Sequence, residues 1–152
     1  ASVDRGDGQD RRSWLGRKKT VKFTADTNVL VRAIVGDDAR QSKAAQTMLA
    51  NADVVALTLP ALCELVWVLA QGYKIVPVQI AEAIRRLING ANVTVNRPAV
   101  EAGLALLDKG GDFADGVIAH EGNWLGAETF LSFDRKAVKL MQAQGWSARL
   151  SS

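Results

Sequence analysis

Four acidic residues stand at positions where their carboxylates could act on one substrate. Asp26 follows the apolar segment VKFTA, Asp115 lies in GGDFAD and Asp134 follows TFLSF, so each comes where a strand ends or a helix begins. Any one of them could simply cap a helix, which contributes about 0.5–2 kcal/mol. We expect Asp112 to be such an N-cap, which leaves Asp115 at the third position of its helix.

Glu64 is the fourth acid and the hardest to explain by structure alone. It lies in LPALCELVWVLA, a predicted helix with apolar residues on nearly every side and no other charge. Such a helix is expected to be buried, and a buried carboxylate needs a counter-charge. The nearest basic residue in sequence is Lys74. We therefore expect Glu64 to face a bound cation; the alternatives are a narrow exposed strip or a distant arginine.

The predicted topology brings these acids together. In a parallel sheet the carboxyl ends of the strands share one edge, where ligand sites form. Four carboxylates at that edge repel one another unless divalent cations are present. Oxygen ligands suit Mg²⁺ or Mn²⁺ rather than zinc, because the chain offers only Cys63 and His120 as softer ligands. Such ions in a carboxylate cluster activate water for the hydrolysis of phosphodiesters.

Short apolar runs alternate with longer helical patterns, which predicts an α/β domain with a largely parallel sheet. Strands are expected at 21–25, 53–57, 92–95, 129–132 and 146–149. Helices are expected at 26–33, 38–51, 60–71, 113–121 and 135–144, with one from Pro77 to a stop at 89–90 and one from Pro98 to a stop at 110–111.

The composition predicts one globular domain. The chain has 152 residues, of which 48% are hydrophobic and 23% charged. Residues 1–20 are interpreted as a flexible basic extension, either an artificial or over-long start or a native basic arm, and residues 21–152 as the domain. The extension carries the whole net charge of +3, so contacts to a polyanion must come from local patches or bound cations. The single Cys63 and the lack of an apolar run of about 18 residues or a secretory signal predict a soluble, cytoplasmic protein.

Four segments carry a resemblance to a known family: DTNVLVRAIVGDD from Asp26, LCELVWVL around Glu64, GGDFADGVIA with Asp115, and LSFDRKA with Asp134. In order and spacing they resemble the four acidic motifs of PIN-domain ribonucleases, most closely the VapC-type toxins of bacterial toxin–antitoxin pairs. The resemblance spans residues 21–150. It implies an α/β, PIN-like three-layer fold, with a largely parallel central sheet flanked by helices.

The same resemblance implies a function and a site. Asp26, Glu64, Asp115 and Asp134 would be both the metal ligands and the catalytic carboxylates, with Mg²⁺ or Mn²⁺ as cofactor. Asn28 and Ser132 would support them as polar neighbours, and Asp112 would add an outer carboxylate. The implied activity is that of an endoribonuclease toxin of a type II toxin–antitoxin pair, cutting structured RNA such as tRNA or rRNA. The implied partners are a second copy in a homodimer and a VapB-like antitoxin whose C-terminal segment fills the acidic groove.

Two other functions remain open at this point. The fold could be a catalytically silent binding module whose acids dock a basic segment of a partner protein. A phosphatase of the haloacid-dehalogenase type is disfavoured, because Asn28 stands where its second aspartate is needed. Among the remaining residues we expect Trp67 in the core, Trp124 and Trp146 in packing, His120 at the surface, and Cys63 as a small buried hydrophobe.

Overall fold

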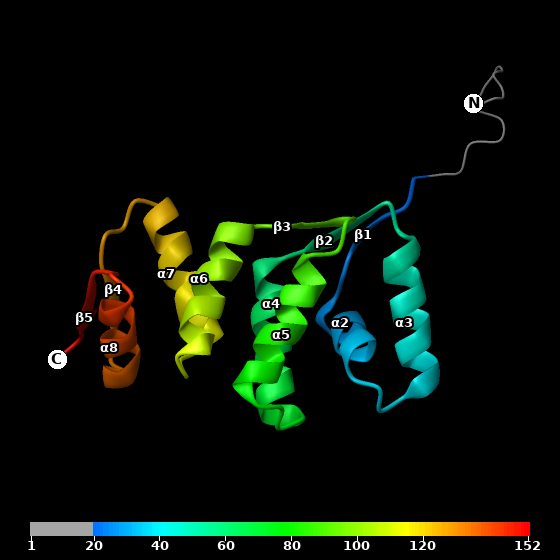
Figure 1. Cartoon of the computed structure of the whole chain (residues 1–152). Coiled ribbons are helices and arrows are strands. Elements are labelled where there is room, and N and C mark those ends of the chain that lie inside the picture. Colours follow the sequence, from blue (N-terminus) through cyan, green and yellow to red (C-terminus); the bar gives the residue numbers. More distant parts are fainter. Residues whose placement is uncertain (1–19) are drawn as a thin grey trace, which may run out of the picture.

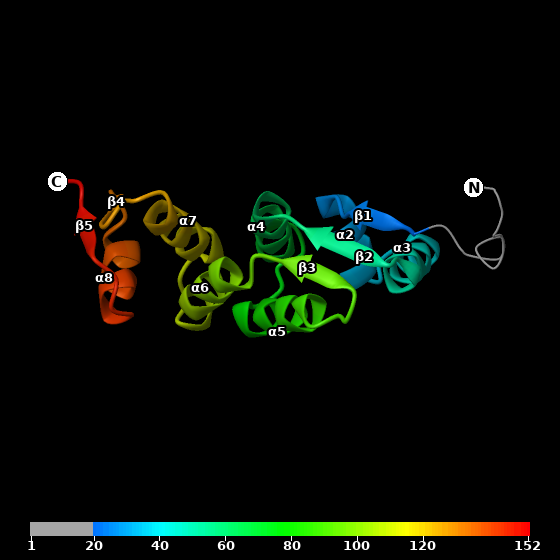
Figure 2. The ribbon, with the colours of Figure 1, turned by 90° about the horizontal axis from the view of Figure 1, so that it is seen from above.

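A computed structural model describes residues 20–152 of the chain, so the predicted extension lies outside the described residues apart from Thr20. Its first part is a three-stranded parallel sheet in the order β1-β2-β3, formed by β1 (Lys22–Thr24), β2 (Val54–Leu57) and β3 (Val93–Val95) (Figures 1 and 2). Phe23 pairs with Val55, which in turn pairs with Val93. The strands are short, so helices supply most of the core.

The two faces of this sheet differ. Phe23, Val55 and Leu57 point toward one face, and beneath it lie the helices α2 (Thr27–Ile34), α3 (Ala39–Asn51), α4 (Leu59–Trp67) and α5 (Pro77–Ile88) (Figure 1). The fully buried side chains of this layer include Leu30, Leu62, Leu65, Leu69, Ile80 and Ile84. The opposite face carries Lys22, Thr24 and Thr94, which are exposed. In residues 20–152 the helices therefore cover one face of the sheet.

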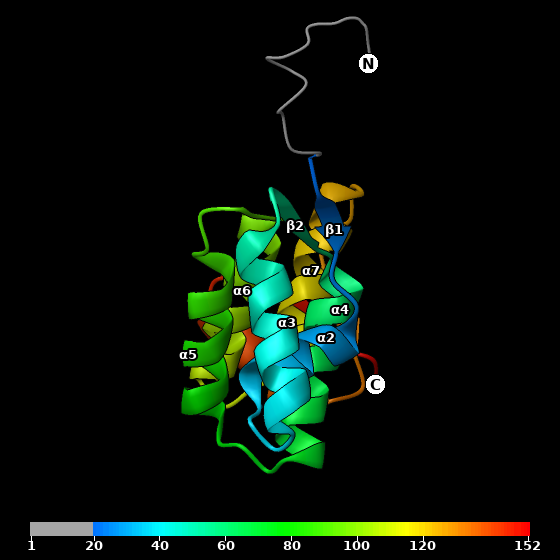
Figure 3. The same cartoon turned by 90° about the vertical axis from the view of Figure 1, so that its right-hand side faces the viewer.

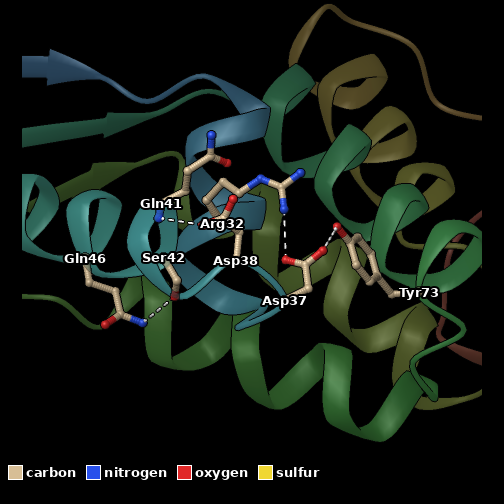
Figure 4. Close-up of polar contacts among 7 residues, drawn as sticks. All are labelled: Arg32, Asp37, Asp38, Gln41, Ser42, Gln46 and Tyr73. Carbon is tan, nitrogen blue, oxygen red and sulfur yellow. Dashed lines mark hydrogen bonds and ion pairs between the residues drawn. The ribbon is translucent and has the colours of Figure 1, made fainter.

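A polar clamp joins the end of α2 to the end of α4. The Arg32 guanidinium donates to Asp37 over 2.8 Å, and the Tyr73 hydroxyl donates to the other oxygen of Asp37 over 3.0 Å (Figure 4). Partial desolvation of Asp37 opposes its ionisation, but the two hydrogen bonds outweigh it and hold its pKa below the ordinary value of 3.8. Tyr73 follows a π-helical turn, η1 (Val68–Gly72), which continues α4. The clamp fixes α2 and α4 relative to one another.

The second part of the chain contains α6 (Arg97–Asp108), α7 (Phe113–Trp124), β4 (Phe130–Ser132), α8 (Arg135–Ala143) and β5 (Ala148–Leu150). Helices α6 and α7 pack so closely that a Cβ on Gly116 would collide with the backbone of Ala102. The strands β4 and β5 form a separate two-stranded parallel sheet. A small core of Leu106, Ala119 and the fully buried Met141 joins α6, α7 and α8.

The α/β class with parallel strands is confirmed, and every predicted strand and helix is present. Some boundaries differ: α7 ends at Trp124 rather than at residue 121, β5 begins at Ala148 rather than at residue 146, and the predicted helix at 60–71 divides into α4 and the π-helical turn η1. None of the helices at residues 20–152 has both the length and the hydropathy needed to span a membrane.

Candidate functional site

Asp26 and Glu64 are linked through the residue between β1 and α2. Asp26 occupies the N-cap position of α2 but makes no capping hydrogen bond with its side chain. The next residue, Thr27, donates from Oγ1 to Glu64 Oε1 over 2.6 Å. The capping explanation therefore does not account for Asp26, and its carboxylate is exposed beside a second acid held by Thr27.

Glu64 is exposed, so the argument that placed it in a buried helix is wrong. Four of the exposed residues of α4 and η1 form one strip along the helix: Pro60, Glu64, Trp67 and Gln71. Their spacing of three or four residues is that of an amphipathic helix. Because proline and tryptophan count as apolar in a hydropathy pattern, they conceal this strip in the sequence. Glu64 occupies the narrow exposed strip that was the alternative interpretation.

The other acids gather around a hollow of about 560 Å³. Asp112, Asp115 and Asp134 line it, together with Trp67 and Gln71 from the exposed strip of α4 and η1. Asp112 accepts a hydrogen bond from Ala114 N over 3.1 Å, so its predicted N-cap role is confirmed. The start of α7, the start of α8 and the end of α4 bound the hollow, and residues of α5 and α6 also line it.

Asp115 is the acid whose chemistry this hollow changes most. Burial, and then the negative charges of Asp112 and Asp134, raise the pKa of Asp115 from 3.8 to about 6. In residues 20–152 no ion pair joins any of these three acids to a basic side chain, although Lys136 also lines the hollow. The hollow therefore holds three carboxylates that no ion pair of the described residues neutralises.

Asp134 is both a helix cap and a wall of the hollow. Its Oδ1 accepts from Lys136 N over 2.9 Å and from Ala137 N over 3.2 Å, and its own N–H donates to Ser132 Oγ over 2.9 Å. Ser132 therefore orients the backbone at Asp134, whereas its expected role of orienting ligands or water beside the acids stays a prediction. Because one carboxylate oxygen carries both capping bonds, the second oxygen is left for a ligand.

The structure divides the four predicted acids into two groups. Asp26 and Glu64 lie at the start of α2 and on α4, whereas Asp115 and Asp134 line the hollow. Within residues 20–152 no three Asp, Glu, His or Cys side chains come close enough to hold one metal ion. The convergence of all four acids is thus not formed by the described chain alone, and their catalytic role stays a prediction.

Asn28 is not among the residues that line the acidic hollow. It lines a second, largely apolar hollow of about 360 Å³ between β1, α2 and α3, together with Phe23, Val29 and Met48. As a polar neighbour of the acids, Asn28 also stays a prediction.

The remaining sequence expectations have mixed outcomes. Cys63 is half-buried, and burial followed by the charges of Asp112 and Glu121 raises its pKa to about 11, so it is no nucleophile. Trp146 packs against the small C-terminal core, as expected. Trp67 and Trp124 are instead 66% and 86% exposed, which corrects both predictions.

Sequence reasoning missed three polar or aromatic side chains that contact the candidate acids or line the acidic hollow. Thr27 positions Glu64, and Trp67 and Lys136 line the acidic hollow. Thr27 and Lys136 each follow a candidate acid by one or two positions, so their proximity was a usable signal. Nothing in the local pattern distinguished Trp67 from a core residue, because its neighbours Leu65 and Val66 are buried.

A family model described as the PIN domain matches residues 24–141, more than half of the chain. The protein therefore belongs to the PIN domain family, a family of nuclease folds whose members typically use divalent metal ions. No match was found among the curated proteins compared with the chain.

Proposed function

We propose that this PIN-domain protein is a Mg²⁺- or Mn²⁺-dependent endoribonuclease and the toxin of a type II toxin–antitoxin pair. The observation that carries the proposal is the acidic hollow, where Asp115 has a pKa of about 6 beside Asp112 and Asp134. Burial and then its acidic neighbours make Asp115 resist ionisation, and a hard cation bound beside it would favour the ionised carboxylate.

The donor chemistry of the hollow fits such an ion. Mg²⁺ is usually held by one or two carboxylates, with water and substrate phosphates completing its octahedral shell. Asp115 and the free oxygen of Asp134 would supply these carboxylates, and Asp112 would act from a further distance through water. When bound, the ion would activate a water molecule and neutralise charge on the leaving oxygen of a phosphodiester.

The chain's own side chains would then orient the RNA. Trp67 presents an exposed ring at the rim of the hollow, where a nucleobase could stack. Lys136, at the start of α8, could contact a phosphate next to the acids. The hydrogen bond from Thr27 orients the carboxylate of Glu64, which lies on the same exposed strip of α4 as Trp67. These contacts favour a single-stranded or looped region of a structured RNA.

The direct test measures cleavage of total tRNA and rRNA by the purified protein, before and after EDTA and after adding back Mg²⁺ or Mn²⁺. We expect cleavage that EDTA stops and either ion restores. Asp115→Asn and Asp26→Asn should reduce cleavage and growth inhibition to background while the circular dichroism spectrum stays unchanged. Glu128→Gln, which removes an exposed carboxylate outside both groups, is the matched control. Full activity of either Asp→Asn variant would contradict the mechanism.

The partners belong to the same proposal. An antitoxin with an arginine in its C-terminal segment would complement the negative hollow and displace the metal and the RNA. A homodimer is expected as well. Copurification of the protein with the product of an adjacent small gene, and loss of RNA cleavage in that complex, would support the antitoxin.

A catalytically silent binding module remains the second candidate. The observation that favours it is the division of the acids into two groups, with no three-ligand metal cluster within residues 20–152. Such a module would bind a basic peptide in the hollow with an affinity that falls with salt and is indifferent to EDTA. Metal-restored RNA cleavage would exclude it.

A further inference from the structure

We propose that two copies of this chain exchange their C-terminal units, so that β4 of one copy adds to the open edge of β1 of the other. The exchanged unit consists of β4, α8 and β5. The two copies would then share each active site. The catalytic part of this inference rests on the proposed function, whereas the exchange itself does not.

The first argument is the unpaired edges of two parallel strands. In the described residues β1 bonds only to β2, and β4 bonds only to β5. Unpaired strand edges invite pairing with another chain. A two-stranded parallel sheet is also unusual, because parallel sheets are normally larger and covered on both faces. Pairing β4 with β1 would unite the two sheets into one five-stranded parallel sheet in the order β3-β2-β1-β4-β5.

The second argument is the apolar surface at both edges. Next to β1 lies the hollow of about 360 Å³ between β1, α2 and α3, lined by Phe23, Val29 and Met48. Figure 3 looks at the chain from the end where α3 and α2 lie in front. On the C-terminal unit, Leu131 of β4 is 61% exposed and Phe133, directly after it, is 82% exposed. Large apolar side chains in such positions indicate a contact surface. In the exchanged dimer, the exposed Leu131 and Phe133 of one copy would fill the apolar hollow beside β1 of the other copy.

The third argument is the handedness of strand connections. The connections β1-β2 and β2-β3 run across the sheet in one direction, with their helices on one face. The connection from β4 to β5 would run in the opposite direction if β4 lay beside β1. Because such crossovers are right-handed, α8 would then lie on the opposite face. That is the face which α2 to α5 leave open, at the exposed Lys22 and Thr24.

The unit's attachment to its own chain favours a second copy as the source of β4. Figures 1 and 2 show β4, α8 and β5 beyond α6 and α7, at the end of the molecule away from β1. The buried Met141 holds α8 to Leu106 and Ala119, and Gln144 Nε2 donates to Ala105 O over 3.2 Å. Closing onto its own β1 would expose this core. Reciprocal exchange around a two-fold axis keeps it intact.

Exchange would also reunite the acids. The junction between β1 and β4 is the point where the strand order reverses, and ligand sites of parallel sheets form there, beyond the carboxyl ends of the strands. Asp26 follows β1 and Asp134 follows β4. Asp134, with Asp115 in the same hollow, would therefore meet Asp26 and Glu64 of the other copy. Each site would draw its carboxylates from both chains.

Disulfide trapping tests the exchange without reference to activity. Two differently tagged copies, both carrying Cys63→Ser, are co-expressed and purified through both tags. One carries Thr24→Cys at the end of β1, and the other carries Leu131→Cys, Ser132→Cys or Phe133→Cys in turn, which covers three registers of pairing. Neighbouring strands lie about 4.8 Å apart, within the range of a disulfide. We expect oxidation to join the two copies covalently through at least one of these positions. Thr94→Cys in β3, at the same level of the sheet as Thr24, is the matched control and should not react.

Three results would overturn the exchange: a monomer at all concentrations, no covalent pair at any of the three positions, or a disulfide that forms only when both cysteines are in one chain. The last would mean that the unit closes on its own β1.

Complementation tests the shared site. A copy with Asp26→Asn and a copy with Asp134→Asn are each expected to be inactive, while their heterodimer keeps one site with all its acids and recovers about half of the wild-type cleavage. Sites built within one chain would give no recovery and overturn the sharing. If wild-type protein cleaves no RNA but the copies are trapped as a covalent pair, the proposed function fails and the exchange stands.

Discussion

Replacing the acid at the centre of the hollow should stabilise the fold while removing its activity. Asp115 has a pKa of about 6 in the folded chain against an ordinary 3.8. Its charged form is therefore disfavoured by folding, and stability is lost as the pH rises between these two values. Without solvent screening, this difference in pKa corresponds to about 3 kcal/mol in the free energy of unfolding. Because Asp115 is only half-buried, solvent screening reduces the expected effect to about 1–2 kcal/mol.

Asp115→Asn removes this charge and keeps the shape of the side chain. The variant should melt about 3–6 °C above the wild type at pH 7.5 in EDTA. Toward pH 4 the difference in melting temperature should shrink, because Asp115 is then protonated in the folded wild type and partly protonated in the unfolded wild type. Thermal denaturation followed by circular dichroism from pH 4 to 8 measures the difference. Mg²⁺ should raise the melting temperature of the wild type more than that of the variant.

Glu128→Gln serves as the control, since it removes an exposed carboxylate with no hydrogen-bond partner among residues 20–152. Its melting temperature should follow the wild type across the pH range. A stabilisation by Asp115→Asn that does not change with pH, or a variant less stable than the wild type at pH 7.5, would refute the electrostatic description of the hollow.

Three further predictions concern packing, reactivity and RNA binding. Gly116→Ala places a Cβ against the backbone of Ala102 and should lower the free energy of unfolding by about 1–3 kcal/mol in urea denaturation. The control Gly122→Ala, whose Cβ would meet only a side-chain atom at 4.0 Å, should leave the free energy of unfolding unchanged. Cys63, with a pKa of about 11, should react slowly with Ellman's reagent at pH 8 and fully only after denaturation; fast reaction of the folded protein would show an accessible thiolate. Trp67→Ala should weaken RNA binding by about 1–3 kcal/mol and raise KM more than it lowers kcat, and an unchanged KM would exclude stacking at this position.

The order and type of the elements could be predicted from the sequence because their signals are local. Asp38, Thr58, Asn96, Asp112 and Asp134 all accept hydrogen bonds from the helices that they precede. Capping side chains act within a few residues of their own position, so they mark helix starts without knowledge of the fold. Asp26, Asp115 and Asp134 were recognisable for a similar reason, since each stands at or near the start of a helix, whereas Glu64 was recognisable as the one charge in an apolar helix.

The exposure of α4 could not be predicted in this way. Its hydrophobic pattern predicts burial on every side, but Glu64 and Trp67 are exposed because no described element covers that strip. Whether an apolar position is buried depends on what the rest of the chain packs against it. That is a property of tertiary structure and not of helical periodicity.

The amino-acid sequence by itself determined that this protein is a parallel α/β domain with carboxylates at the ends of its strands, because strand length, helix periodicity and capping depend on neighbours within a few residues. Only the tertiary structure decided which carboxylates meet. It places Asp115 with Asp134 in one hollow and Asp26 with Glu64 elsewhere. The physical reason is that their grouping depends on where β4 and α8 dock, and the contacts of Met141 and Gln144 that determine this docking join residues 22 to 39 positions apart along the chain.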